Sequence, residues 1–89
     1  MAKVRFTSHL VRHRPLPGAE AQGATVAEVL DAVFSGDDLL RGYVLDDQGR
    51  VRKHVNIYLD GALIADRVRL SDPVSPQAEI YVLQALSGG

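Results

Sequence analysis

The stretch TVAEVLDAVFSG, residues 25–36, is the clearest helical pattern in this chain of 89 residues. Thr25 and Glu28 have the spacing of a capping box, in which a hydroxyl and a carboxylate each accept a hydrogen bond from a free amide at the start of a helix. Gly36 suits the end of the helix. The pattern predicts a helix over Val26–Ser35 with one apolar face that must pack against another element. That face consists of Val26, Val29, Leu30, Val33 and Phe34.

On the N-terminal side of this helix, residues alternate in polarity over Lys3–Leu10, with Val4 and Phe6 on one face. Alternation of this kind predicts a half-buried strand. Residues 12–23 then contain two prolines and two glycines, which favour a loop. Within that loop, Gly18–Gly23 is a candidate for a weak returning strand, although its residues have low strand propensity.

On the C-terminal side, turn-forming residues at Asp46–Gly49 separate a short apolar run from a basic one, which predicts a hairpin-like reversal. Val55–Leu59 alternates in polarity and predicts a strand, which ends at the turn pair Asp60-Gly61. Beyond it the sequence predicts a short edge strand within residues 63–70, a loop over 71–77 and a last strand over Glu79–Leu86.

The predicted elements are one helix and four to five strands in a single small domain. A helix laid across one mixed sheet buries both apolar faces with few elements, so the predicted fold class is α+β. The composition, with 46% hydrophobic and 24% charged residues and a net charge of −1, is that of an ordinary globular domain and names no partner by charge. We expect the domain over residues 1–84 and a flexible tail at 85–89.

Several kinds of chemistry are excluded or disfavoured by the sequence. It contains no cysteine, so disulfides, thiolate metal sites and a cysteine nucleophile are excluded. No apolar run approaches the length of a membrane span or has the pattern of a signal peptide, so we expect a cytoplasmic protein without membrane contact. His9 and His13 are spaced for a metal site only on a helix, and their segment is predicted to be extended. His54 has no partnering serine or carboxylate pattern and is interpreted as a solvated strand end.

Charged residues form three small clusters. The basic cluster of Arg50, Arg52 and Lys53 lacks interleaved aromatic residues, and the chain as a whole is not basic. We therefore expect it to attract an acidic partner surface and not nucleic acid. The adjacent pairs Asp37-Asp38 and Asp46-Asp47 could suggest catalytic carboxylates, but each lies in a turn-like stretch, and solvated turns explain both.

Three features together carry a resemblance to a known family: the order of the elements, the segment RKHVNIYLDG at residues 52–61, and the diglycine Gly88-Gly89. A diglycine alone is a weak signal, but one that follows the last strand of a strand–strand–helix domain of this length is more specific. Together they resemble the small ubiquitin-like sulfur carriers of the MoaD/ThiS type, and in particular the branch that serves cysteine synthesis. The resemblance implies a β-grasp fold.

The resemblance also implies a function for the tail that ends in Ser87, Gly88 and Gly89. An activating enzyme would use ATP to convert the carboxylate of Gly89 to an acyl-adenylate and then to a thiocarboxylate, which donates sulfur to an enzyme of cofactor or cysteine biosynthesis. A carboxylate is anionic at neutral pH and a poor electrophile, so adenylation is needed to supply a leaving group. Glycine has no Cβ, which lets the backbone enter a narrow channel. The chain itself is expected to be no enzyme and to bind no cofactor.

The alternation of the strands also predicts a docking face. The side chains of Tyr58, Tyr81 and Leu83 should lie on the face of the sheet away from the helix, where they and Leu86 would bind the partner. The alternative is cross-strand packing on an otherwise solvated face. The positions that would face the helix are Val55, Ile57, Leu59, Ile80 and Val82.

Two other functions stay open at this point. The first is a ubiquitin-like modifier that joins Gly89 to a lysine amine of another protein through the same adenylate. The second is a passive β-grasp binding module whose tail has no role. The sulfur acceptor also stays open between a cysteine-synthase-like enzyme, the large subunit of a molybdopterin synthase and a thiazole-forming enzyme.

Overall fold

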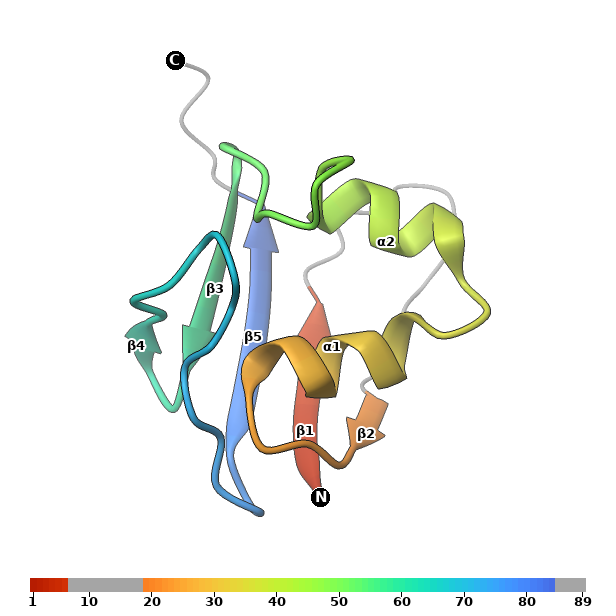
Figure 1. The fold of residues 1–89 in the computed structure, drawn as a ribbon. Coiled ribbons are helices and arrows are strands. Elements are labelled where there is room, and N and C mark those ends of the chain that lie inside the picture. The colour runs from red at the N-terminus through yellow and green to blue at the C-terminus, as the bar shows by residue number, and fades with distance from the viewer. Residues whose placement is uncertain (7–18, 85–89) are drawn as a thin grey trace.

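The computed structural model describes residues 1–6 and 19–84, which form a mixed five-stranded sheet with two helices on one of its faces (Figure 1). The strand order is β2-β1-β5-β3-β4. The central pair, β1 and β5, is parallel, and the other neighbouring pairs are antiparallel. The strands are Ala2–Phe6 (β1), Ala19–Ala21 (β2), Val55–Leu59 (β3), Ala62–Leu63 (β4) and Glu79–Gln84 (β5). The helices are Val26–Phe34 (α1) and Asp38–Val44 (α2).

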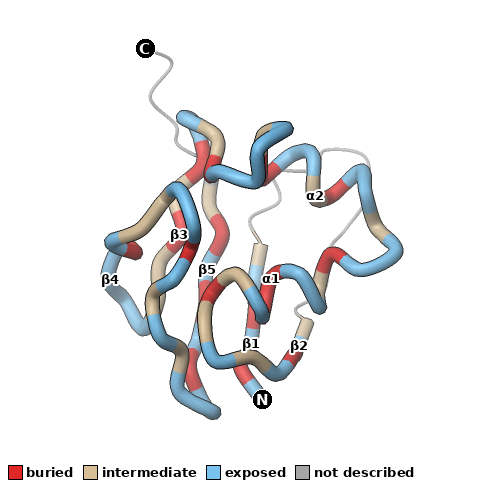
Figure 2. The backbone as a smooth tube through the Cα atoms, in the orientation of Figure 1, coloured by how far each residue is buried: buried red, intermediate tan, exposed pale blue. Residues whose placement is uncertain are grey.

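The inner face of the sheet forms one half of the hydrophobic core. Val4 lies opposite Ile80, and Ile57 lies opposite Val82, and all four side chains are fully buried. Buried positions alternate with exposed or half-buried ones along the strands (Figure 2). The predicted core face is therefore confirmed, with the difference that Leu59, near the end of β3, is only partly buried.

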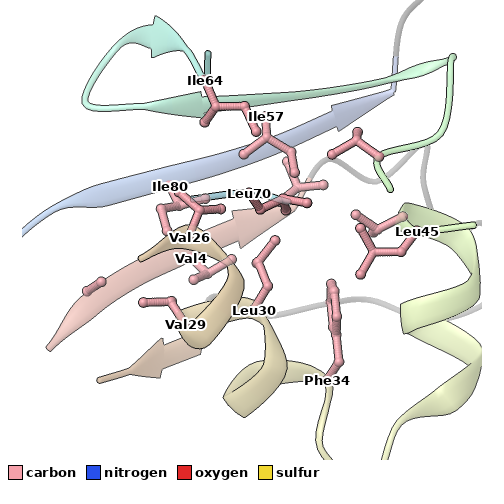
Figure 3. Packing of buried hydrophobic residues seen from close by; sticks show 14 of the residues in the cluster. Val4, Val26, Val29, Leu30, Phe34, Leu45, Ile57, Ile64, Leu70 and Ile80 are labelled. Atoms are coloured by element: carbon pink, nitrogen blue, oxygen red, sulfur yellow. The ribbon is translucent and has the colours of Figure 1, made fainter. Parts of the chain in front are cut away.

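Helix α1 forms the other half of the core and has the predicted cap. The amide of Glu28 donates to the Thr25 hydroxyl over 3.2 Å, and the Glu28 carboxylate accepts from the amide of Ala24 over 3.1 Å. The helix ends at Phe34, one residue before the predicted boundary. The apolar stripe points at the sheet (Figure 3), and its buried members are Val26, Val29, Leu30 and Phe34.

The second helix, α2, is a difference from the prediction of a single helix. Its cap is Asp37, whose carboxylate accepts from the amide of Leu40 over 3.1 Å, so the Asp37-Asp38 pair starts a helix and is not a solvated turn. The sequence pattern is weak because α2 has only seven residues and contains Gly42. Burial of Leu40 and Val44 stabilises it in the folded domain.

The reversal predicted after this region is present at Asp46–Gly49. Leu45 and Val51 form an antiparallel bridge across it, and the amide of Asp46 donates to the carbonyl of Arg50 over 2.8 Å. The Asp46 carboxylate accepts from the Arg50 amide over 3.0 Å. Asp46 is thus a turn residue, as predicted.

The N-terminal strands agree with the prediction where the structure describes them. β1 covers Ala2–Phe6, and the rest of the predicted first strand lies outside the described residues. The weak returning strand exists as β2, which pairs antiparallel with Ala2–Val4. His9 and His13 also lie outside the described residues.

The C-terminal half differs from the prediction at the sheet edge. The edge strand β4 is only two residues long, and residues 64–78 form a loop. β3 and β4 are joined by Asp60-Gly61, both with positive φ (51° and 89°), which is a hairpin turn of the type that follows the sheet twist. The last strand is described up to Gln84.

Candidate partner-binding site

The predicted site lies at the end of the sheet where the central strand β5 terminates. Gln84, the last described residue, pairs with Val55, the first residue of β3. The start of β3 and the end of β5 therefore lie at the same end of the sheet, at the top of Figure 1. The predicted tail residues Leu86, Ser87, Gly88 and Gly89 lie outside the described residues.

The outer face of the sheet brings the other predicted site residues together. Tyr58 on β3 lies directly opposite Tyr81 on β5, and Leu83 lies opposite Asn56 two pairs further along, which is the next pair on the same face. The side chain of Tyr81 is exposed, while Tyr58 and Leu83 are half-buried. Cross-strand neighbours and an exposed tyrosine are thus both present on this face.

Two further residues extend this row across the sheet. Arg5 on β1 pairs with Tyr81, and Leu63 on β4 pairs with Tyr58, which puts one cation and one exposed leucine at the two ends of the tyrosine pair. Leu63 is 56% exposed. Sequence reasoning did not identify Leu63 because a face can be assigned to an edge strand only when its pairing register is known.

A mixed row of this kind has the composition of an interface anchor. Arginine and tyrosine are enriched at the centre of protein interfaces, where apolar neighbours exclude water from them. Arg5, Leu63 and the two tyrosines together offer a cation, phenol groups and apolar surface on a rigid sheet. We call the row Arg5, Tyr58, Leu63, Tyr81 and Leu83 the docking face.

A basic hollow of about 520 Å³ lies at the end of the sheet where β3 begins and β5 terminates. It is lined by Asp46, Arg50, Val51, Arg52, Lys53, His54, Arg67 and Val68. The predicted basic cluster thus lines a single hollow, and Arg67 joins it from the loop after β4. Sequence reasoning missed Arg67 because no motif in residues 64–78 predicts that this loop packs against the start of β3.

The charges of the hollow are partly paired. The Arg50 guanidinium is 3.1 Å from the Asp46 carboxylate. The hydrogen bond from the Arg50 amide is the largest cause that lowers the pKa of Asp46, and the Gln48 amide and the Arg50 charge lower it further. Asp46 and Arg50 therefore neutralise each other on one side of the hollow.

The other perturbed carboxylate, Asp66, is structural. It accepts hydrogen bonds from the amides of Val68 and Arg69 and from the Ser71 hydroxyl. These bonds, the Arg69 amide first, lower the pKa of Asp66 to about 2. An acid with so low a pKa is a weak base, so its arrangement suits holding a loop and not proton transfer.

Within residues 1–6 and 19–84, no group of three or more histidine or acidic side chains is arranged to hold a metal ion. In the same part of the chain, neither helix has the length and apolar character needed to cross a membrane. The surface features that the structure does describe are the row called the docking face and the basic hollow.

The comparison with known proteins agrees with this geometry. The sequence profile of the ThiS family matches residues 12–89. A chain in the crystal structure of the BexX/CysO complex from Amycolatopsis orientalis is 23% identical, with a TM-score of 0.82, and the match covers 100% of both chains. CysO from Mycobacterium tuberculosis is 18% identical, with a TM-score of 0.80, and the match covers 97% of this chain and 100% of that one.

The small archaeal modifier protein 1 from Methanosarcina acetivorans is also similar. It is 21% identical, with a TM-score of 0.80, and the match covers 99% of this chain and 95% of that one. No curated protein sequence matches the chain. The fold shared with these structures is the β-grasp fold that the family resemblance implies.

Proposed function

The chain belongs to the ThiS family, and from this premise we propose that it is a sulfur carrier whose C-terminal Gly89 is converted to a thiocarboxylate. Family and fold together make it a ubiquitin-like carrier or modifier. The observation that carries the finer proposal is the family match itself, which extends through the diglycine to Gly89. In the sequence, the diglycine follows Gln84, the last described residue of β5, after only three residues.

The proposed chemistry has two steps, both performed by an activating enzyme. First, a carboxylate oxygen of Gly89 attacks the α-phosphate of ATP, which releases pyrophosphate and forms an acyl-adenylate. Second, hydrosulfide attacks the acyl carbon, AMP leaves, and a thiocarboxylate and a proton are formed. In this proposal the chain is not an enzyme, and its contribution is to present the tail.

The described fold supports a presenting role for the chain. The docking face provides an anchor on the sheet, while the tail beyond Gln84 can extend about 17 Å at roughly 3.3–3.6 Å per residue. Docking and chemistry are therefore separate tasks of separate parts of the chain. An acceptor enzyme would use the same tail when it takes the sulfur.

The experiment that tests the proposal is intact-mass measurement of the chain after incubation with an activating enzyme, ATP and sulfide. We expect the mass change of one oxygen-to-sulfur exchange, and no change when ATP is omitted. A chain that keeps its mass with an activating enzyme known to be active on its own carrier would contradict the proposal.

The matched variants are deletion of Gly89 and replacement of Gly88 by phenylalanine. Both should abolish the mass change, because the first removes the reacting carboxylate and the second adds a ring to backbone that must enter a narrow channel. Neither should lower the melting temperature, because the described core is formed by residues up to Val82. Sulfur loading of the chain without Gly89 would exclude Gly89 as the reacting residue.

A second candidate function has a specific observation in its favour. The similarity to the small archaeal modifier protein 1 supports a protein modifier, in which a lysine amine of a target attacks the adenylate of Gly89 and AMP leaves. The same mass measurement separates the two functions. A branched conjugate that contains the sequence up to Gly89 on a lysine would favour the modifier, and an exchange of oxygen for sulfur favours the carrier.

A further inference from the structure

The basic hollow gathers side chains from two segments that are distant in sequence. Arg52, Lys53 and His54 precede β3, and Arg67 comes from the loop after β4. We call these four residues the basic collar. The whole chain has a net charge of −1, so this concentration of positive charge is local and not a property of the composition.

The two arginines of the collar are held in fixed positions by carbonyl groups. The Nη2 group of Arg67 donates to the carbonyls of Arg52 and Val55, each over 2.7 Å. The Nε group of Arg52 donates to the carbonyl of Gly42 over 2.7 Å. These bonds fix the guanidinium groups but leave their charges uncompensated, because a carbonyl carries no formal charge.

Among residues 1–6 and 19–84, no carboxylate forms an ion pair with Arg52, Lys53 or Arg67. A guanidinium has five N–H donors, so Nη1 and Nη2 of Arg52 and Nε and Nη1 of Arg67 remain available. Arg50, in contrast, is paired with Asp46 and lies outside the collar. Arg52, Lys53 and Arg67 are thus cationic donors without an anionic partner in the described part of the chain, and hydrogen bonds hold the two arginines in place.

The position of the collar limits what can approach it. It directly precedes Val55, which pairs with Gln84, and only five residues follow Gln84. When Gly89 is inside the active site of a partner, it lies at most about 17 Å from Gln84. A partner that takes Gly89 into its active site therefore meets the collar at the surface where the tail enters.

We propose that the basic collar binds carboxylate side chains at the mouth of the tail-accepting channel of a partner enzyme. The inference rests on the proposed function, because it assumes that a partner takes the tail. The guanidinium of Arg52 can bind a carboxylate through two parallel hydrogen bonds from Nη1 and Nη2, because only its Nε is used by a carbonyl. Arg67 already uses Nη2 for two carbonyls, so it adds its charge and single hydrogen bonds. Complementary charge also speeds encounter between proteins. The lining of the hollow contains no tyrosine, phenylalanine or tryptophan, which disfavours nucleic acid, since single strands bind by stacking on aromatic rings.

The first test does not require any sulfur chemistry. The ¹⁵N-labelled chain is titrated with hexaglutamate, and with hexaglutamine as the uncharged control, while amide chemical shifts are recorded. We expect saturable shifts at residues 52–54 and 67 with hexaglutamate alone. Shifts spread over the whole surface, or shifts equally large with a single-stranded oligonucleotide of the same charge, would overturn the assignment to carboxylates.

Two charge reversals provide a matched pair for this titration. Lys53→Glu changes the collar, and Lys3→Glu makes the same change of charge at the other end of the sheet, where Lys3 pairs with Glu79. Both side chains are exposed, so both variants should fold. We expect Lys53→Glu to weaken hexaglutamate binding roughly threefold to tenfold, and Lys3→Glu to change it less than twofold. Equal effects of the two variants would show net charge and not the collar to be responsible.

The second test uses the loading assay. With Lys53→Glu, the carrier concentration for half-maximal loading should rise several-fold with an unchanged maximal rate, and the difference should fall as salt is added. An unchanged half-maximal concentration for Lys53→Glu would overturn the inference. If the wild-type chain is not loaded at all, the proposed function fails, and the hexaglutamate titration still decides whether the collar binds carboxylates.

Discussion

At the scale of single residues, hydrogen bonds stabilise the ionised form of Asp66 and lower its pKa to about 2. It accepts hydrogen bonds from the Arg69 amide over 2.9 Å, the Ser71 hydroxyl over 2.6 Å and the Val68 amide over 3.1 Å. Asp72 completes the loop, since its carboxylate accepts from the amides of Ala65 and Asp66. The loop in turn contacts α1, because the Leu70 carbonyl accepts from the Ala27 amide over 2.9 Å. Ionised Asp66 therefore supports the loop on which the first turn of α1 rests.

This constraint predicts how stability depends on pH. The pKa of Asp66 is lowered from 3.8 to about 2 on folding, so its stabilising contribution is complete above the unfolded pKa and is lost as pH falls from about 4 toward 2. Asp66→Asn should lower the melting temperature at pH 7, and the difference from the wild type should shrink below pH 4. Thermal unfolding followed by circular dichroism across this range measures it. A difference that stays constant down to pH 2 would contradict the assigned role of the carboxylate.

At the scale of elements, α2 is shorter than α1 and contains a glycine, Gly42, that its backbone conformation does not require. Gly42 lies inside α2 with a negative φ and open space where a Cβ would be. Gly42→Ala should raise the free energy of unfolding by about 0.5–1 kcal/mol, because alanine loses less backbone entropy in a helix. Gly36→Ala is the matched control. It also has open space, but its φ of +78° makes alanine strained, so it should destabilise. Urea unfolding of both variants checks the opposite signs.

Substitutions on the two faces of the sheet should affect different properties, namely stability for the inner face and partner binding for the outer face. Ile57 is fully buried, so Ile57→Ala should lower the free energy of unfolding by about 2–5 kcal/mol through loss of packing. Leu83 lies on the docking face and is half-buried. Leu83→Ala should leave the domain folded and weaken partner binding by about 2 kcal/mol or more, which is over tenfold.

Melting temperature and loading are measured for both of these variants. Ile57→Ala should melt early and load in proportion to its folded fraction, whereas Leu83→Ala should melt close to the wild type and load poorly. Early melting of Leu83→Ala together with normal melting of Ile57→Ala would mean that the two faces have been assigned the wrong way round.

At the scale of the whole molecule, the parallel pairing of β1 with β5 sets the two ends of the sheet apart. Lys3 pairs with Glu79, where β5 begins, while Gln84 ends β5 at the opposite edge, about 17 Å away at roughly 3.3 Å per residue. Met1 is 58% exposed and precedes β1 at the end of the sheet opposite Gln84. The N-terminus and the last described residue of β5 therefore lie at opposite ends of the sheet.

This separation predicts that the position of a tag decides loading. A short peptide fused before Met1 should leave sulfur loading unchanged, because it extends from the edge opposite Gln84. The same peptide fused after Gly89 should abolish loading, because the reacting carboxylate becomes an amide. Intact-mass measurement of both fusions provides the check. Normal loading of the C-terminal fusion, without prior cleavage of the peptide, would exclude Gly89 as the reacting group.

The sequence alone determined the elements that are specified by residues close together in the chain. The helix after Thr25 has a cap and a complete apolar stripe, and β3 has an alternating run closed by Asp60-Gly61, so both were predicted within one residue. The diglycine that carries the proposed function is likewise read directly from the chain. Such features depend on neighbours a few residues apart, and the sequence lists those neighbours in order.

Tertiary structure alone decided the features that depend on distant residues. α2 forms because Leu40 and Val44 are buried in a core made by other elements, which a seven-residue pattern with an internal glycine does not reveal. The row across the docking face needs the register of four strands, and the basic collar needs Arg67 to reach the carbonyls of Arg52 and Val55. These contacts form only when folding brings separate segments together. They depend on the free energy of folding of the whole domain, including loop closure and burial, and not on local residue preferences.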